Sequence, residues 1–262
     1  MTTDLPTGNS APSFLTQENG ERIAYHYSAG AAPGVVFLHG LMSDMDGGKA
    51  LAVEEYCKKR GQAFLRFDCQ GHGQSDGDFK DGTIERWSND TVDMLDKVCE
   101  GPQILIGSSM GGWNMLLSAM KRPEKIAGLI GIAAAPDFTE DLMMDDLTHE
   151  QHHTIQEQGY VEIPSDYGDE PYVISKTLLD NGRENLVLRK PIPLDVPVRL
   201  LHGKKDEDVP WATALKIEQM ITSDDVETTF IKNGDHRLSE DHDLERLTRT
   251  LEALLKQLES KA

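Results

Sequence analysis

The residues most able to do chemistry lie on a glycine-rich stretch in the first half of the chain. The sequence GSSMGG at residues 107–112 fits the pattern G-x-S-x-G centred on Ser109. The apolar run 103–106 precedes it, and residues 113–120, with helical spacing of apolar side chains, follow it. A serine on a sharp strand-to-helix turn presents its hydroxyl at the positive end of the helix, and its flanking residues must be small. The pattern therefore predicts a nucleophile at Ser109.

Two other interpretations of this turn are a purely structural turn and a phosphate-binding loop. A phosphate loop carries a lysine after its last glycine, where this chain has Trp113. A serine hydroxyl is a poor nucleophile until a neutral imidazole accepts its proton. The nucleophile interpretation therefore requires a base and an acid further along the chain.

Two later loops supply these groups. Asp206 follows the apolar run 198–201, and His236 follows the run 226–231. A buried carboxylate holds such a histidine in the correct tautomer and stabilises the imidazolium as it forms. The order serine, aspartate, histidine is the one that proteins with a nucleophile on a strand-to-helix turn use. We therefore expect Ser109, Asp206 and His236 to form a catalytic triad.

Neighbouring carboxylates leave an alternative for the acid. Glu207 and Asp208 are rivals of Asp206, and Asp235 is adjacent to the base. Asp206 is preferred because it lies nearest to the end of its strand. For His236, a surface loop histidine would be the default interpretation if the serine motif were absent.

The oxyanion hole is expected to consist of the backbone amides of Leu41 and Met110. Leu41 follows the first buried strand, and Met110 follows the nucleophile. His39, two residues before Leu41, is expected to shape this loop. Methionine adapts to irregular apolar ligands, so Met42 and Met143, together with Trp113, are candidate substrate-binding residues. Core packing is the alternative for each of these three.

Strands that alternate with helices predict an α/β fold with a doubly wound, mostly parallel sheet. The expected strands are residues 13–17, 22–28, 34–38, 62–67, the run from 103, 126–134, 160–164, 198–201 and 226–231. The expected helices are residues 49–60, 84–98, the run to 120, 140–158, 172–181, 211–221 and 240–258.

The alternation is interrupted after the sixth strand by a segment longer than one crossover helix requires. Residues 136–195 are expected to form a small lid inserted into a core made of residues 12–135 and 196–262. Residues 1–11 are polar with Pro and Gly and are expected to be a disordered tail.

Several sequence blocks resemble the α/β-hydrolase superfamily and, more narrowly, the family of the mitochondrial palmitoyl-protein thioesterase, which also acts as an acyl-glucuronide esterase, and its bacterial relatives. The blocks are KALAVEEYC at 49–57, GPQIL at 101–105, GSSMGGW at 107–113, RLLHG at 199–203, DVPW at 208–211 and DHR at 235–237. The resemblance implies an α/β-hydrolase fold from about residue 13 to 258, the triad above, and thioesterase activity.

Composition limits the partners and the compartment. The 262 residues include 45 Asp and Glu against 26 Lys and Arg, a formal net charge of -19, which argues against nucleic acid or an anionic membrane as a partner. The cysteines Cys57, Cys69 and Cys99 are odd in number and lack CxxC spacing, which indicates a reducing compartment. Neither a signal or transit peptide nor a run long enough for a membrane span is visible, so we expect a cytoplasmic protein without membrane insertion.

One metal-binding motif competes with the serine site. Residues 149–153 match H-E-x-x-H, in which two histidines one helical turn apart bind zinc. Polar residues surround the motif, so a solvated helix is the preferred interpretation, and neither a metal nor another cofactor is expected.

The function predicted from the sequence is a serine hydrolase that cleaves carboxylic thioesters or esters, on a small molecule or a protein, through an acyl intermediate on Ser109. A palmitoyl-protein thioesterase follows from the resemblance, and a general short-chain carboxylesterase is its close rival. From other classes, a non-catalytic ligand-binding protein on the same fold and a zinc peptidase using His149 and His153 stay open. The oligomeric state is not predicted.

Overall fold

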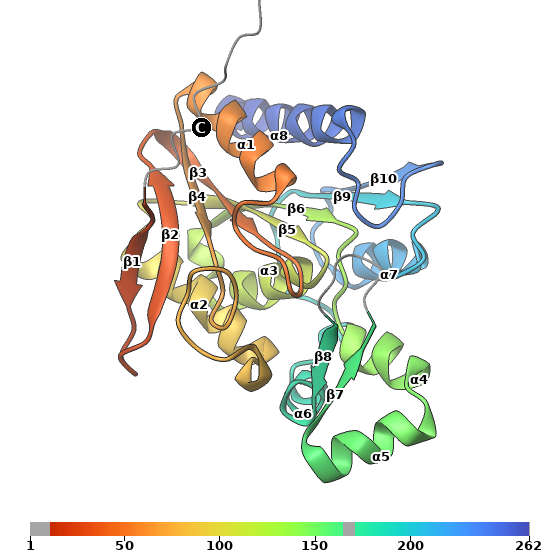
Figure 1. The fold of residues 1–262 in the computed structure, drawn as a ribbon. Helices are drawn as coiled ribbons and strands as arrows, with labels where there is room; N and C mark the ends of the chain where they lie inside the picture. Colours follow the sequence, from red (N-terminus) through yellow and green to blue (C-terminus); the bar gives the residue numbers. More distant parts are fainter. Residues whose placement is uncertain (1–10, 165–170, 262) are drawn as a thin grey trace, which may run out of the picture.

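The computed structural model describes residues 11–164 and 171–261 (Figure 1). The expected tail therefore lies outside the described residues except for Ala11. An eight-stranded sheet runs through the described part in the order β1-β2-β4-β3-β5-β6-β9-β10. Its strands are β1 (Ser13–Thr16), β2 (Arg22–Ser28), β3 (Ala31–Leu38), β4 (Gln62–Phe67), β5 (Gln103–Ser108), β6 (Ile126–Ile132), β9 (Val198–Gly203) and β10 (Val226–Ile231).

The sheet is parallel from β4 to β10, and β2 joins antiparallel to both β1 and β4. The predicted doubly wound, mostly parallel sheet is thus confirmed. Parallel strands end at one edge, so the loops that follow β3, β5, β9 and β10 meet there. This edge carries the residues that the sequence motifs select.

Helices cover both faces of the sheet (Figure 1). The helices α1 (Gly48–Arg60) and α8 (Asp241–Lys261) pack with one set of strand side chains, and α2 (Ile84–Lys97), α3 (Met110–Lys121) and α7 (Ala212–Met220) pack with the other. Single turns of 3₁₀-helix lie at η1 (Phe79–Asp81) and η2 (Pro123–Lys125). The strands supply both cores by alternation: Val35 and Phe37 face α1 and α8, whereas Val36 and Leu38 face the opposite side.

The segment between β6 and β9 forms a separate layer, drawn in green and teal in Figure 1. It contains a π-helical turn at Thr139–Met143, α4 (Met144–Asp146), α5 (His149–Gln158), β7 (Tyr160–Ile163), β8 (Tyr172–Ser175) and α6 (Lys176–Glu184). Five buried side chains give it a small core: Leu147, Ile155, Val161, Ile174 and Leu179. We refer to residues 136–195 as the insertion.

Two expectations for the insertion differ from the structure. The helix expected over 140–158 is interrupted at Leu147, because Thr148 accepts a hydrogen bond from the Gln151 amide and starts a new helix with a capping box. The helix expected over 172–181 begins instead as strand β8, which pairs antiparallel with β7. Its aromatic and β-branched residues favour a strand, and Ser175 then caps α6.

A buried aspartate ties the two ends of the insertion together. The Asp137 carboxylate accepts hydrogen bonds from the amides of Val187 (2.7 Å) and Leu188 (2.9 Å). Asp137 has a φ of 61° and a side chain with no solvent exposure. The two ends of the insertion are therefore hydrogen-bonded to each other where the segment joins the core.

The turn after β5 depends on the absence of side chains. A methyl group at Gly111 would stand 2.2 Å from the Leu38 carbonyl oxygen, and one at Gly107 would stand 2.4 Å from the Gly111 carbonyl oxygen. Both obstacles are backbone atoms, which cannot rotate away. Helix α3 can therefore approach the end of β3 only with glycine at these positions.

We predict that Gly111→Ala lowers the free energy of unfolding by about 3 kcal/mol or displaces the turn, because overpacking against backbone costs roughly 1–3 kcal/mol or more. Thermal and urea unfolding measure this change. Gly48→Ala is the matched control, since a methyl group there meets nothing within 4 Å. Equal stability of the two variants would contradict the proposed role of close approach.

Candidate active site

Ser109 occupies the turn between β5 and α3 with a strained backbone. Its φ of 53° and ψ of -120° lie outside the regions that non-glycine residues favour. The surroundings impose this conformation: the Ser109 amide donates to the Ile132 carbonyl (2.9 Å), and its carbonyl accepts from the Ala135 amide (3.0 Å). Strain of this kind costs about 1–3 kcal/mol and is common at functional sites.

A continuous series of hydrogen bonds starts at this serine. His236 Nε2 lies 3.0 Å from Ser109 Oγ, and His236 Nδ1 lies 2.9 Å from Asp206 Oδ2. Because Nδ1 donates to the carboxylate, a neutral His236 has its lone pair on Nε2, directed at the serine hydroxyl. The structure thus brings together the three residues that the sequence selected as nucleophile, base and acid.

The Asp206 carboxylate accepts four hydrogen bonds. Oδ2 receives His236 Nδ1 and also His202 Nε2 (3.1 Å), while Oδ1 receives the amides of Asp208 (3.0 Å) and Val209 (2.8 Å). Burial by itself would raise the pKa of Asp206, but the hydrogen bonds from both histidines and the Val209 amide outweigh it and hold this pKa far below its usual value. The carboxylate is therefore ionised while it faces His236.

Sequence reasoning missed His202. This histidine lies near the end of the apolar strand β9, and its side chain is 1% exposed. A polar residue in a strand buried on both faces is a signal that could have identified it, because buried polar groups require hydrogen-bond partners.

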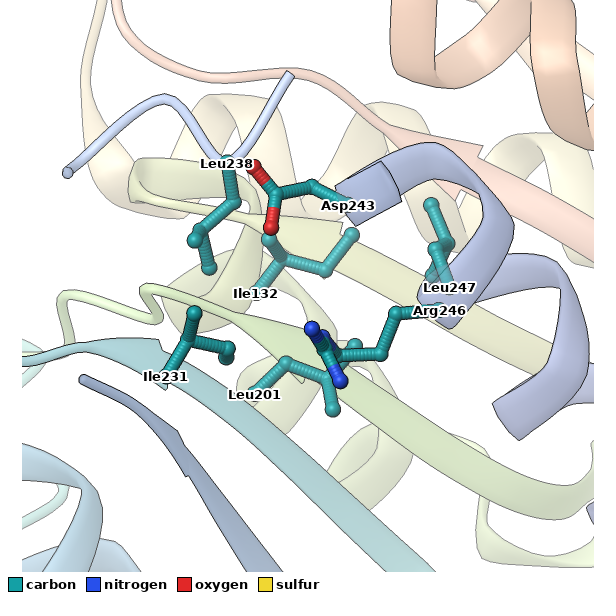
Figure 2. Close-up of a pocket in the computed structure, with 7 residues that line it drawn as sticks. All are labelled: Ile132, Leu201, Ile231, Leu238, Asp243, Arg246 and Leu247. Atoms are coloured by element: carbon teal, nitrogen blue, oxygen red, sulfur yellow. The ribbon is translucent and has the colours of Figure 1, made fainter. Parts of the chain in front are cut away.

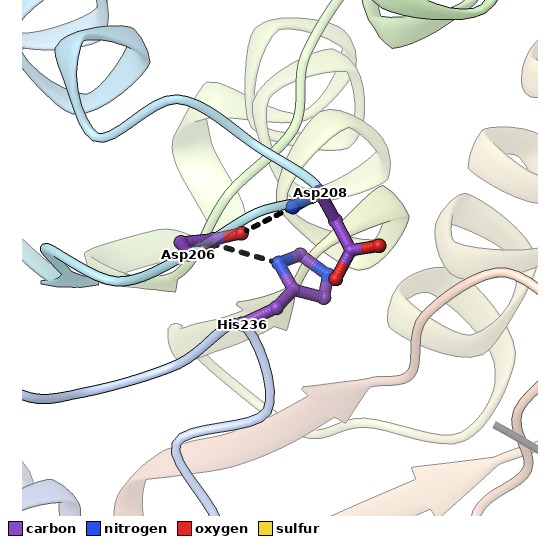
Figure 3. Close-up of side chains that lie close together, drawn as sticks. All are labelled: Asp206, Asp208 and His236. Carbon is purple, nitrogen blue, oxygen red and sulfur yellow. Dashed lines mark hydrogen bonds and ion pairs between the residues drawn. The ribbon is translucent and has the colours of Figure 1, made fainter. Parts of the chain in front are cut away.

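Asp208 lies beside the other edge of the His236 ring (Figure 3). Asp206, Asp208 and His236 each offer a ligand atom within 4.8 Å of the others, so a cation could be considered there. Asp206, however, already accepts four hydrogen bonds, and His236 Nε2 faces Ser109. The donor set fits a hydrogen-bonded catalytic series better than a closed metal site.

The loop after β3 brings Leu41 next to the serine. Leu41 and Met110 both line the cavity that contains Ser109 and His236. Met110 is the first residue of α3, and an amide at that position has no partner within its own helix. The geometry is compatible with the expected oxyanion hole.

Two buried histidines fix the shape of this loop. His39 Nε2 accepts from the Cys69 amide (3.0 Å) and Nδ1 donates to the Gly40 carbonyl (2.8 Å), while His72 Nε2 accepts from the Met42 amide (3.3 Å). Met42 has a φ of 52°, so the loop is bent sharply where His72 holds it. Burial, followed by the neighbouring His39, lowers the pKa of His72 to about 3, which keeps its Nε2 an acceptor.

A cavity of about 1100 Å³ opens at Ser109, and it has two unlike walls. The insertion contributes a mostly apolar wall that contains Phe138, Leu142, Met143, Leu147 and Ile174, together with the polar Asp146 and Gln151. The loops after β3, β9 and β10 and the start of α1 contribute a charged wall made of Asp44, Asp46, Lys49, Asp208 and Arg237.

The three candidate substrate-binding residues differ in position. Met42 and Met143 line the cavity, whereas Trp113 does not. The Trp113 ring is fully buried, packs edge-on against Phe138 at 5.5 Å, and donates its indole N–H to the Asn185 carbonyl (3.1 Å). Trp113 therefore packs behind Phe138 and does not itself line the cavity.

A second cavity lies between β6, β9, β10 and the start of α8 (Figure 2). Its volume is about 10 Å³, which is room for about one water molecule. It is lined by Ile132, Leu201, Ile231, Leu238, Asp243, Arg246 and Leu247. Its size excludes it as a substrate site.

The H-E-x-x-H motif lies on the first turns of α5. His153 is exposed and lies 3.4 Å from Glu157, one turn further along the helix. Within residues 11–164 and 171–261, the side chains close enough to share a metal ion are the group around His236, and His149 and His153 form no such group.

Comparison with known proteins extends the sequence resemblance. A family model described as serine aminopeptidase, S33 matches residues 31–157. The mouse protein named palmitoyl-protein thioesterase ABHD10, mitochondrial, is 43% identical over 247 residues, which cover 94% of this chain and 83% of the mouse protein. Its human counterpart is 39% identical, with 94% and 80% coverage.

Solved structures of two hydrolases are similar to this chain in both sequence and fold. Alpha/beta hydrolase domain-containing protein 10 from mouse superposes with a TM-score of 0.87 at 42% identity, covering 95% of this chain and 100% of that one. A putative hydrolase from Agrobacterium vitis S4 has a TM-score of 0.88 at 37% identity, with 94% and 97% coverage. The predicted superfamily and fold are confirmed.

The prediction of a cytoplasmic location is wrong. Five relatives with identities of 43%, 40%, 39%, 39% and 41% are all named mitochondrial. Unpaired cysteines indicate a reducing environment, and this property does not distinguish one organelle from another. No helix among the described residues has the length and apolar character needed to cross a bilayer.

Because His72 stays neutral in the folded protein to about pH 3, the unfolded chain binds more protons at this residue between pH 6.5 and 3. Its contribution to stability is present above pH 6.5 and is lost as the pH falls through this window, by at most about 1.4 kcal/mol per pH unit. We predict that His72→Phe, which keeps a ring against Trp87 and Phe79, is less stable than wild type at pH 7 and that the gap narrows toward pH 5.

Urea unfolding at pH 7, 6 and 5 measures the gap. His153→Gln, at an exposed histidine, is the control and should leave the pH dependence unchanged. A gap between wild type and His72→Phe that stays constant with pH would contradict the assignment of a buried neutral imidazole.

Proposed function

The chain belongs to the α/β-hydrolase family of the palmitoyl-protein thioesterase ABHD10 and is a serine hydrolase of ester or thioester bonds; from this premise we propose that it removes long-chain acyl groups from protein thiols. The observation that carries the proposal is the hydrogen-bonded series Ser109–His236–Asp206 at the mouth of a cavity with one apolar wall. The relatives' names supply the thioester and the acyl class.

Acylation begins at the serine. Ser109 Oγ attacks the thioester carbonyl carbon while His236 Nε2 takes the hydroxyl proton, over the 3.0 Å that separate the two atoms. Asp206 stabilises the imidazolium through Nδ1–H. The carbonyl oxygen becomes an oxyanion, which the amides of Leu41 and Met110 stabilise; one such donor is worth about 2.7–4 kcal/mol of barrier.

The tetrahedral intermediate then collapses. The carbon–sulfur bond breaks, His236 returns the proton to the leaving thiolate, and the acyl group stays on Ser109. A water molecule, deprotonated by His236, attacks the acyl carbon; the bond from this carbon to Ser109 Oγ then breaks, His236 returns the proton to Oγ, and the fatty acid is released. No further cofactor enters these steps.

The insertion serves as the lid in this proposal. Residues 136–195 place Phe138, Leu142, Met143, Leu147 and Ile174 along the cavity, and an alkyl chain buried against them gains about 0.8 kcal/mol per methylene. The charged residues of the cavity come from the loops after β3, β9 and β10 and from the start of α1, and we propose that the leaving group departs along them. We propose the core to be residues 12–135 and 196–262.

Ser109→Ala is predicted to abolish hydrolysis of acyl thioesters and esters together with labelling by a fluorophosphonate probe. The loss follows because no other hydroxyl lies at the hydrogen-bonded end of His236 in the described structure. Rates with p-nitrophenyl esters and gel fluorescence measure the two effects. Wild-type protein that fails to react with the probe would favour a non-catalytic binding protein.

Chain-length selectivity tests the substrate class. We expect kcat/KM to rise toward palmitoyl in a series of acyl thioesters and to exceed that of matched oxygen esters, since the cavity of about 1100 Å³ that contains Ser109 is lined by several apolar side chains of the insertion. A maximum at two to four carbons with esters preferred would replace this proposal by a general short-chain carboxylesterase.

Asp206→Asn is predicted to lower kcat by about four orders of magnitude, because the amide no longer holds His236 in the productive tautomer. Asp208→Asn is the matched control: its amide still donates to position 206, and its side chain is not hydrogen-bonded to His236 Nδ1. Steady-state rates of the two variants distinguish the rival acids, and a larger loss in Asp208→Asn would reverse the assignment.

A further inference from the structure

His202 donates to the same carboxylate oxygen that orients His236. Its Nε2 lies 3.1 Å from Asp206 Oδ2 and 3.0 Å from the Val209 carbonyl oxygen. Both neighbours are acceptors, so Nε2 carries the proton and shares it between them. Building on the proposed function, we infer that His202 is a positioning residue that holds Asp206 in place for His236.

The position of His202 makes it a rigid support. It lies in β9 between β6 and β10, opposite Phe230 of β10, and its side chain is 1% exposed. The carboxylate that it holds stands on a loop, whose Lys205 amide donates to the Gly234 carbonyl two residues before His236. His202 therefore connects the acid to the sheet itself, in addition to the bonds between the two loops.

His202 also limits the charge that Asp206 offers to His236. Two donors on one oxygen share its negative charge, so each bond is weaker than it would be alone. Without His202, Oδ2 keeps His236 as its only side-chain donor, while Oδ1 keeps the amides of Asp208 and Val209. The hydrogen bond between Asp206 and the imidazolium form of His236 is then stronger in the variant. A larger fraction of the variant enzyme is therefore in this inactive form at a given acidic pH.

Other charged groups around His236 are unchanged by substitution at position 202. They are Asp208 beside the ring, Asp235 and Arg237 on the same loop, and Lys49 of α1, whose ammonium donates to the Arg237 carbonyl. Lys204 contacts the rings of Trp211 and Phe230 and is also retained. A difference in pH profile between variants at position 202 therefore reports on His202.

The test compares His202→Leu with His202→Gln. Gln places an amide N–H near the position of Nε2–H and does not ionise, whereas Leu fills the space without a donor. We expect Leu to lower kcat about tenfold or more with KM changed less than about twofold, and to move the acid limb of kcat/KM upward by about half a pH unit. We expect Gln to keep kcat within about threefold and the acid limb in place.

Each outcome decides the inference. An unchanged acid limb and kcat in His202→Leu would overturn it, and so would equal losses in Leu and Gln, which indicate a packing role. If His202→Leu fails to fold, His202→Asn, whose shorter amide falls short of Asp206, takes its place against Gln under the same criteria. Activity that persists in Ser109→Ala would refute the covalent mechanism itself and is thereby distinguished from a failure of His202.

Discussion

A single buried carboxylate sets the conditions that the site must satisfy. The Asp206 side chain has no solvent exposure, and an ionised carboxylate in that position is stable only if hydrogen bonds replace water. Two amides from its own loop and two histidines from other segments supply them. The loops after β9 and β10 are thus held together by the same bonds that orient the base.

Backbone contacts of the turn between β5 and α3 position Ser109 next to His236. Gly107 and Gly111 allow α3 to approach β3 closely enough for the Ser109 amide and carbonyl to bond the end of β6 and the chain beyond it. The strained backbone conformation of Ser109 is tolerated because these hydrogen bonds hold it in place. The nucleophile and the acid are therefore positioned by separate interactions, and His236 forms a hydrogen bond with each of them.

The sequence was informative where chemistry restricts residue type. The serine turn requires glycines at defined spacing, and the order of Ser109, Asp206 and His236 along the chain follows from strands that end at one edge. The mostly parallel sheet follows from continuous apolar runs that alternate with helices, whereas the order of its strands was not predicted. The structure agrees with these expectations, and the roles of the three side chains stay proposals.

Interactions between distant segments account for what the sequence could not provide. The burial of Trp113 depends on Phe138 and Asn185, and β8 forms because β7 lies beside it. His202 contacts a residue four positions later, and the conformation of the turn after β9 determines that contact. Periodicity describes one element at a time and contains no information about such contacts.

The histidines near the site show how one side-chain type serves different ends. His39 and His72 use their rings to hold backbone amides, and burial lowers the pKa of each, so they stay neutral acceptors. His236 is 16% exposed and donates Nδ1–H to the Asp206 carboxylate, which leaves Nε2 directed at Ser109. In the proposed mechanism the proton taken from Ser109 must reside on His236 and not on His39 or His72. The burial of His39 and His72 is therefore as necessary to this mechanism as the carboxylate beside His236.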